Sequence, residues 1–237
     1  MGFFDKLFGK KDKAEDKAAT VGFDEGDIFY TFSDGKYHLY KLLKHDQVYG
    51  TYHVLCYEET ATLPEPDSVK DMKVIVYHTP IAADGFTEPR LLVKSKISND
   101  DMMGYMEYLR QMGDDAIVVA ADGYYKEAYK FTDMGRHEEA IIKYGLAAEL
   151  VPEFFEAIDN KAFCYMDLGQ WDAAIKDFEQ SLSVNPDGFA AIFSIGECYM
   201  RLEKYAEAKV YLERAQTIDP SNKHTGPFLK KIEELMK

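Results

Sequence analysis

The sequence predicts an α+β protein, in which a small antiparallel β-sheet or barrel domain precedes a solenoid of paired α-helices. Two observations support this: residues 22–97 contain short apolar runs separated by turn signals, and residues 121–222 repeat with a period of 34. The 237 residues are 46% hydrophobic, which suffices for one large core or two modest ones. This composition excludes obligate disorder, a collagen-like fibre and a disulfide-stapled miniprotein.

The charge balance argues against nucleic acid as a partner. Lys and Arg total 28 against 42 Asp and Glu, a formal charge of −14, and a phosphate-binding surface requires clustered cations. The 3 cysteines are too few and too widely spaced for a disulfide framework or a zinc module. We therefore expect a cytoplasmic protein of bacterial type in a reducing compartment, with no cofactor and no nucleic-acid partner.

Residues 1–20 predict an amphipathic, charged N-terminal tail. Phe4, Leu7 and Phe8 share one helical face, and lysines follow at positions 10, 11 and 13. Lys6 stands where a myristoylation signal needs Ser or Thr. A short apolar face beside lysines allows a weak, reversible contact with a membrane surface, and a disordered tail is the alternative.

Residues 21–112 predict the small antiparallel β-domain with a trailing helix. Two alternating runs at 26–32 and 36–43 flank Ser33-Asp34-Gly35, which is a tight-turn signal and indicates a β-hairpin. Ser98 with Asp101 forms a capping-box pattern that opens a helix ending near Met112. Three further strands are expected at 48–57, 73–78 and 91–97, with loops at 62–68 and 79–89.

The stretch from Gly26-Asp27-Ile28-Phe29 to Asp34-Gly35-Lys36-Tyr37 resembles the start of a family of bacterial immunity proteins that neutralise polymorphic toxins. The resemblance covers about fifteen residues, and the next strand departs from the family pattern at Leu39-Tyr40-Lys41. It implies an alternative function, in which the β-domain neutralises a cognate toxin.

Catalysis is not predicted for the β-domain. Its histidines show no metal-ligand spacing, and the chain lacks a Gly-x-Ser-x-Gly elbow, a phosphate-binding loop and a dinucleotide fingerprint. An enzyme would need a deep pocket that joins polar groups from several strands, which the sequence does not predict. We therefore expect no enzyme, no catalytic residue and no metal site. The histidines considered as possible metal ligands or catalytic groups are His38, His45, His53 and His78.

The C-terminal half contains an internal repeat of 34 residues. Small residues at two positions let paired helices approach closely, aromatic or leucine side chains fill the space beside them, and a proline follows each second helix. The five columns in phase are Ala128, Ala162 and Gly196; Phe131, Tyr165 and Tyr199; Ala140, Ala174 and Ala208; Tyr144, Phe178 and Leu212; and Pro152, Pro186 and Pro220.

These columns resemble the tetratricopeptide repeat (TPR), with repeats at 121–154, 155–188 and 189–222 and a capping helix within 223–237. The TPR domain is then residues 113–237. Gly135 and Gly169 occupy the turn between the two helices, where Glu203 in the third repeat predicts a turn that is either strained or built differently. This chain departs from the family pattern at two further positions. Where the family has a large aromatic residue, this chain has Tyr124, Ile158 and Ile192. Where the family has a leucine, it has Glu127, Lys161 and Ile195.

The resemblance implies a concave groove lined by the first helix of each repeat. At the positions of the family's carboxylate clamp this chain has Tyr125, Tyr129, Asn160, Ala190 and Ser194, so the clamp's cations are missing. The groove positions carried over from the family are Asp122, Tyr125, Lys126, Tyr129, Thr132, Glu156, Asp159, Asn160, Phe163, Met166, Ala190, Phe193, Ser194, Glu197 and Met200. The partner-binding residues that we select are Tyr125, Tyr129, Asp159, Asn160, Phe163, Met166, Phe193, Glu197 and Met200.

An aromatic and methionine surface edged with acids suits a peptide or amphipathic helix that has an apolar face and basic flanks. The leading hypothesis is therefore a protein-binding adaptor or scaffold. The segment Phe3–Lys13 has this chemistry itself, which suggests docking in its own groove or in that of a second copy. The alternative is that Phe163 and Phe193 only pack between repeats.

Overall fold

The structure is a computed structural model that describes residues 22–47 and 49–236. The tail predicted at 1–20 lies outside the described residues. The chain divides into two compact units, of which the first ends at Tyr105 and the second begins at Met106. The division falls within one helix, α2 (Asn99–Met112). The domain limits drawn from the sequence, 21–112 and 113–237, stay our proposal.

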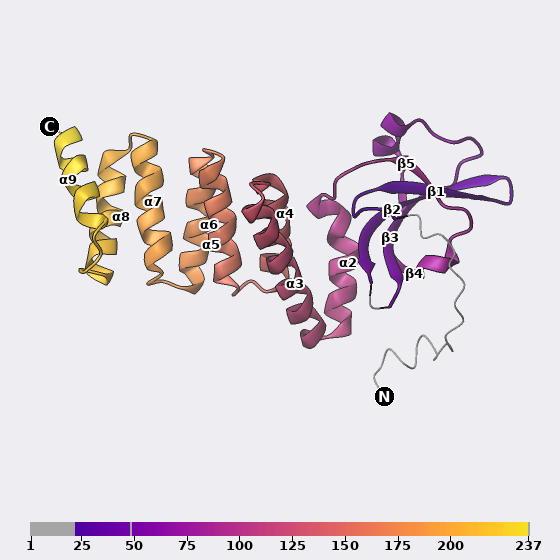
Figure 1. Ribbon diagram of the computed structural model, residues 1–237, viewed down its shortest axis with the longest axis horizontal. Coiled ribbons are helices and arrows are strands. Elements are labelled where there is room, and N and C mark those ends of the chain that lie inside the picture. The colour runs from indigo at the N-terminus through magenta and orange to yellow at the C-terminus, as the bar shows by residue number, and fades with distance from the viewer. Residues whose placement is uncertain (1–21, 48, 237) are drawn as a thin grey trace. The chain divides into compact units, whose positions relative to one another are not determined.

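The first unit contains a five-stranded antiparallel sheet in the order β4-β3-β2-β1-β5 (Figure 1). The predicted antiparallel sheet is confirmed, although β4 extends into the expected loop at 79–89. Two short 3₁₀ helices, η1 and η2, interrupt the connections before and after β4. The bounds are β1 Ile28–Ser33, β2 Lys36–Asp46, β3 Thr51–Tyr57, η1 Pro66–Asp71, β4 Val74–Ala82, η2 Ala83–Gly85 and β5 Arg90–Val93.

The β1–β2 hairpin forms around the predicted turn. Asp34 and Gly35 both have positive φ, 53° and 75°, which an Asp-Gly pair tolerates in a two-residue hairpin loop. The register pairs Ser33 with Lys36 and Thr31 with His38. Because side chains alternate between faces, this register places Thr31, Ser33 and His38 on the same face of the sheet.

The sheet has two covered faces. On one face Phe29, Leu42, Tyr52 and Val54 form an apolar cluster with Phe86 and Phe23. The N-terminal half of α2 contacts the sheet through an ion pair of 2.6 Å between Lys41 Nζ and Asp101 Oδ2.

The N-terminus of α2 has the predicted capping box. Its Ser98 Oγ accepts a hydrogen bond from the Asp101 amide at 3.3 Å, and Asp101 accepts one from the Ser98 amide at 2.7 Å. Gly104 is required one turn later, since a Cβ there would lie 2.6 Å from the carbonyl oxygen of Tyr77.

The second unit is a series of antiparallel helix pairs followed by one further helix (Figure 1). The α+β class and the helical solenoid predicted from the sequence are confirmed. The first helix begins at Asp114, about two turns before the expected start of the first repeat at residue 121. The bounds are α3 Asp114–Asp133, α4 His137–Leu150, α5 Phe155–Asp167, α6 Trp171–Val184, α7 Phe189–Arg201, α8 Tyr205–Ile218 and α9 Thr225–Leu235.

The turns within the pairs follow the sequence prediction. Gly135 and Gly169 both have φ of 71°, and Glu203 has φ of 59° at the equivalent position. A side chain in this left-handed region costs energy that glycine avoids, so the strain expected in the third repeat is confirmed.

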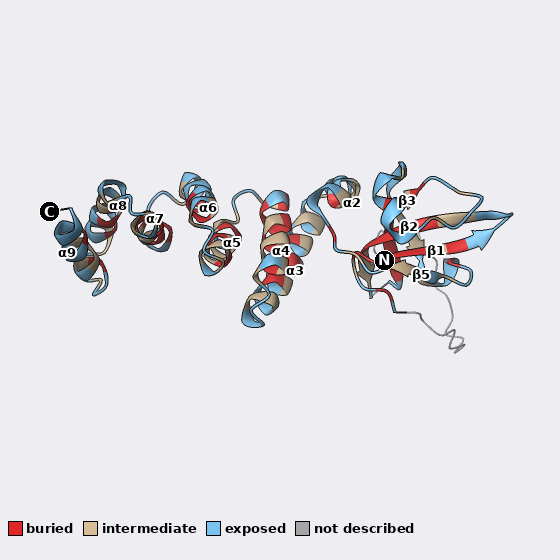
Figure 2. Cartoon of the chain, turned by 90° about the horizontal axis from the view of Figure 1, so that it is seen from above, coloured by how far each residue is buried: buried red, intermediate tan, exposed pale blue. Residues whose placement is uncertain are grey.

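The repeat cores contain the predicted small residues together with Tyr144, Phe178 and Leu212, which are buried between the helices (Figure 2). The other aromatic column, Phe131, Tyr165 and Tyr199, is half-buried beside them. Gly196 shows how closely the helices approach, because a Cβ there would lie 2.7 Å from the Leu212 side chain. The missing leucines have a structural explanation. Glu127 contacts Lys143 at 2.8 Å and Lys161 contacts Asp177 at 3.1 Å, so each charge is paired with the opposite charge sixteen residues later.

The last helix, α9, packs on the third repeat through Ile232, which is fully buried, and through the half-buried Phe228. Leu235 is 47% exposed, because the helix ends there. No described helix has the length and apolarity needed to cross a membrane.

Candidate functional site

The residues expected to line the groove lie on the first helices of the three pairs. Tyr129 on α3 is 54% exposed, and the other selected residues are half-buried, so none is sealed in the core. They are Tyr125 on α3; Asp159, Asn160, Phe163 and Met166 on α5; and Phe193, Glu197 and Met200 on α7. Each can offer part of its side chain to a ligand.

Several of these residues also contact the neighbouring repeat. Asn160 Nδ2 donates a hydrogen bond of 2.9 Å to the hydroxyl of Tyr125, and the Phe193 ring lies 5.3 Å from that of Phe228, edge to face. Both contacts join residues that are thirty-five positions apart in the sequence. The first joins the first repeat to the second, and the other joins the third repeat to α9. The amide of Asn160 is thereby engaged within the protein.

Asp159 in the second repeat occupies the position that Tyr125 has in the first repeat and Phe193 in the third. Its Oδ1 atom is buried without a hydrogen-bond partner among the described residues, while the side chain as a whole is half-buried. Burial raises the pKa of this carboxyl group, a hydrogen bond with Ser181 opposes the rise, and the charge of Glu156 adds to it. The middle of the array thus carries a carboxylate that is poorly solvated and poorly paired.

The charged groups at the expected groove positions are mostly acidic. Lys126 is the only cation among these positions, and its Nζ contacts Asp122 at 2.6 Å within α3. Glu197 is 3.9 Å from Arg201 one turn later on α7. No cation at these positions is therefore left for a carboxylate of a ligand.

Aromatic packing holds the apolar side chains in place. Phe163 lies 5.1 Å from Phe178 in an edge-to-face contact, and Phe193 lies 5.9 Å from Phe189 in a stacked one. Phe163 and Met166 both pack against the core of the second and third repeats. These side chains therefore contribute to packing and still keep part of their surface exposed.

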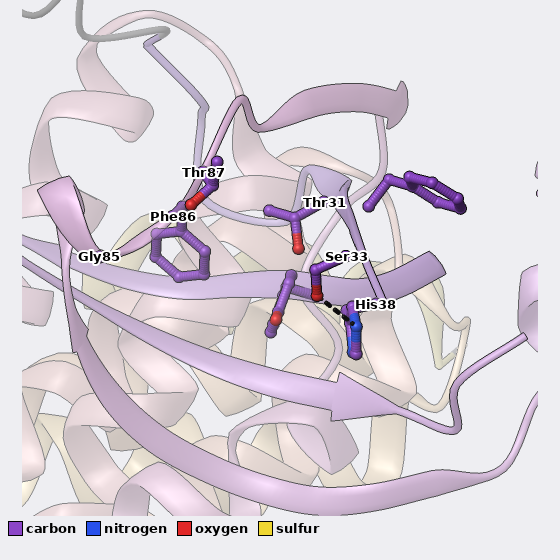
Figure 3. Close-up of a pocket in the computed structure, with 8 residues that line it drawn as sticks. Thr31, Ser33, His38, Gly85, Phe86 and Thr87 are labelled. Carbon is purple, nitrogen blue, oxygen red and sulfur yellow. Dashed lines mark hydrogen bonds between the residues drawn. The ribbon is translucent and has the colours of Figure 1, made fainter. Parts of the chain in front are cut away.

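The β-domain contains a small open pocket that the sequence did not predict, with a volume of about 190 Å³. It joins the end of the β1–β2 hairpin to the loop after η2, and Figure 3 shows Ser33 hydrogen-bonded to His38 beside Thr31, Phe86 and Thr87. Sequence reasoning missed it because the loop at 85–87 reaches the hairpin only in the folded sheet. The lining residues are Thr31, Phe32, Ser33, His38, Tyr40, Gly85, Phe86 and Thr87.

Two further histidines of the β-domain, His53 and His78, pack against each other. His53 Nδ1 and His78 Nε2 are 2.9 Å apart with stacked rings, and Tyr105 covers both. Burial lowers the pKa of each imidazole to about 4, so both are neutral at pH 7. Within residues 22–47 and 49–236, no group of three or more His, Cys, Asp or Glu side chains is placed to hold a metal ion.

Comparison with known proteins finds similarity in the helical half. A family model described as the tetratricopeptide repeat matches residues 165–223, which confirms the resemblance to this repeat within the second and third predicted repeats. No curated protein matches the chain significantly.

Three solved structures similar to this chain are TPR proteins or a chaperone. The first TPR domain of Spaghetti (RPAP3) bound to an HSP90 peptide is 24% identical, with a TM-score of 0.49 over 50% of this chain and 94% of that chain. The first TPR domain of human RPAP3 is 25% identical, with a TM-score of 0.47 over 49% and 92%. The Yersinia enterocolitica type III secretion chaperone SycD with a peptide of the translocator YopD is 19% identical, with a TM-score of 0.48 over 54% and 99%.

Proposed function

We propose that the repeats act as a protein-binding adaptor, which captures a peptide or amphipathic helix along the first helices of the three pairs. The observation that carries this proposal is the chemistry of the expected groove positions. They present half-buried aromatic and methionine side chains next to acids, and their only cation, Lys126, is already paired with Asp122. Capture by such a surface is non-covalent.

The charge pattern favours a basic ligand over an acidic one. A C-terminal carboxylate at these positions would meet Glu156 and Asp159 without a free cation, which costs energy in a partly desolvated site. A lysine or arginine at the margin of the ligand would instead neutralise these acids. We therefore propose that the partner has an apolar face flanked by basic residues.

The apolar surface sets the strength of binding. Two or three aromatic anchors at about 1.5–3 kcal/mol each leave roughly micromolar affinity after the cost of association. Tyr129 is the most exposed of the selected residues, so it offers the largest contact area to a ligand. Its removal should weaken binding roughly tenfold.

The segment Phe3–Lys13 has the chemistry that we propose for the ligand. We propose that this segment docks in its own groove or in that of a second copy and keeps the groove closed until a partner displaces it. Weak contact of the same segment with a membrane surface is the competing role. The toxin-neutralising alternative has no further support beyond the resemblance of residues 26–40.

A fluorescent peptide that copies residues 2–13 tests both proposals on a variant of the chain that lacks them. We expect anisotropy to report micromolar binding, about tenfold weaker for Y129A and unchanged for V210A, which removes an exposed apolar side chain (64%) from α8. A second peptide, a designed amphipathic helix with basic flanks, is compared with its Lys→Glu counterpart.

If the peptide that copies residues 2–13 does not bind but the designed basic helix does, self-docking is rejected and the adaptor proposal stands. Equal binding of the basic and acidic helices, or no binding of either at high micromolar concentration, rejects the adaptor proposal.

A further inference from the structure

Ser33 and His38 line the pocket at the end of the β1–β2 hairpin, and the Glu59 carboxylate lies beside His38 outside that lining. Ser33 Oγ is 3.0 Å from His38 Nε2, and His38 Nδ1 is 3.4 Å from Glu59 Oε1. This arrangement, in which a base contacts a hydroxyl on one side and an orienting carboxylate on the other, is the pattern that activates a serine.

The backbone fixes each of the three residues. Ser33 and His38 lie on one face of the hairpin through the β1–β2 register. Glu59 follows β3, and its neighbour Thr60 exchanges two backbone hydrogen bonds with Tyr37, of 2.8 and 3.1 Å. That exchange holds the Glu59 carboxylate beside His38, although twenty-one residues separate them in the sequence.

The charge of Glu59 favours the tautomer of His38 that can act as a base toward Ser33. The other oxygen of Glu59 contacts Lys36 Nζ at 2.6 Å, and the hydrogen bond from Lys36 lowers the pKa of the Glu59 carboxyl group, which is therefore ionised at pH 7. An ionised carboxylate beside Nδ1 favours the tautomer with the proton on Nδ1. His38 Nε2 then accepts the Ser33 hydroxyl proton.

We propose that this pocket is a serine-type acyl-transfer site that hydrolyses small esters. Ser33 Oγ attacks the ester carbonyl carbon while His38 Nε2 takes its proton, and the imidazolium returns that proton to the leaving alkoxide as the carbon–oxygen bond breaks. Water then attacks the acylated Ser33 with His38 as base, which releases the acid and restores the serine. Water is the only co-reactant, and Glu59 is a positioning residue for His38.

The pocket limits the substrate. Its volume of about 190 Å³ admits a short acyl group, and Phe86 provides a buried apolar wall. Tyr40, which is hydrogen-bonded with Thr31, and Thr87 carry hydroxyl groups on the same lining, and we assign to them the stabilisation of the developing oxyanion. Burial raises the pKa of Tyr40, so its hydroxyl keeps the proton that it must donate.

The test uses the full chain with p-nitrophenyl acetate, a small ester, and a fluorophosphonate probe read by intact mass. We expect steady-state release of nitrophenolate and one adduct on Ser33, with turnover reduced at least a hundredfold in S33A and H38A. S68A is the matched control, because Ser68 is an exposed serine of the same unit whose hydroxyl bonds a backbone carbonyl instead of a histidine. It should match the unchanged chain.

Glu59→Gln separates positioning from a purely structural role. We expect kcat to fall about tenfold with KM unchanged, since the carboxylate orients His38 and does not touch the substrate. The proposal is overturned if S33A hydrolyses the ester as fast as the unchanged chain, if no turnover is detected, or if the probe labels a residue other than Ser33.

Discussion

Replacing Lys161 with methionine should destabilise the repeats by leaving a buried carboxylate without its partner. Lys161 Nζ is 3.1 Å from Asp177 Oδ1, the two side chains are 20% and 8% exposed, and Asp177 Oδ2 is buried without a partner among the described residues. Burial is the main cause that raises the pKa of Asp177, and the charge of Lys161 opposes the rise. The charge of Lys161 therefore offsets part of the free-energy cost of burying the Asp177 carboxylate.

The magnitude follows from the burial of the pair. Removing one partner of a fully buried ion pair costs about 3–5 kcal/mol, and partial exposure of the lysine together with proton uptake by Asp177 reduces this to roughly 2–3 kcal/mol. For a chain of this length, the melting temperature should fall by about 5–10 °C. Circular dichroism at the helical band measures it on the full chain.

The third repeat provides the matched control. Ile195 and Tyr211 occupy the equivalent positions and belong to the same apolar cluster. The double variant K161I/D177Y transplants this apolar pair into the second repeat and should recover most of the lost stability, because replacing both partners removes the buried charge.

The pH dependence of the methionine variant has a definite sign. The pKa of Asp177 is higher in the folded than in the unfolded state, so its penalty is present above the folded pKa and disappears as pH falls through it. The destabilisation should therefore shrink as pH falls toward the ordinary range of a carboxyl group. A loss below about 0.5 kcal/mol in K161M at pH 7, or a double variant as unstable as the single one, would refute the reasoning.

Three further changes test other parts of the fold. Glu203→Gly should stabilise the third repeat by about 0.5–1 kcal/mol in urea titration, because it relieves the positive φ of 59°, and destabilisation would contradict this. Gly104→Ala should destabilise the β-domain by about 1–3 kcal/mol, since its Cβ would lie 2.6 Å from a carbonyl oxygen of β4, and an unchanged unfolding midpoint would reject that contact. The His53–His78 pair has folded pKa values of about 4 against 6.5 unfolded, so stability should fall as pH drops from about 6.5 to 4. Amide exchange in β3 and β4, corrected for intrinsic rates, should quicken over that range, and a flat profile would speak against the pair.

The repeats could be predicted because they depend on local and periodic signals. Small residues recur where helices must approach, and Gly135 and Gly169 recur where the chain must take a positive φ. Glu127 and Lys161 looked like departures from the pattern because their partners lie on the second helix of each pair. The spacing of sixteen residues to the opposite charge was present in the sequence, but only helix packing makes it a contact.

The β-domain pocket could not be predicted for the same reason. No local motif joins Ser33 to Glu59, and their approach requires the hairpin register and the backbone hydrogen bonds between Thr60 and Tyr37. The pairing of His53 with His78 similarly depends on the register of two neighbouring strands, with an irregularity between them. Contacts between strands that are distant in the sequence leave little local pattern from which they could be predicted.

Methyl NMR of the methionines tests the adaptor proposal most directly. Met166 and Met200 lie among the expected groove residues, whereas Met103 and Met134 are exposed elsewhere, at 58% and 68%. On titration with the designed basic amphipathic helix, we predict shifts of the Met166 and Met200 methyl signals and none for Met103 or Met134. Shifts confined to Met103 and Met134, or none at saturating peptide, would contradict the account.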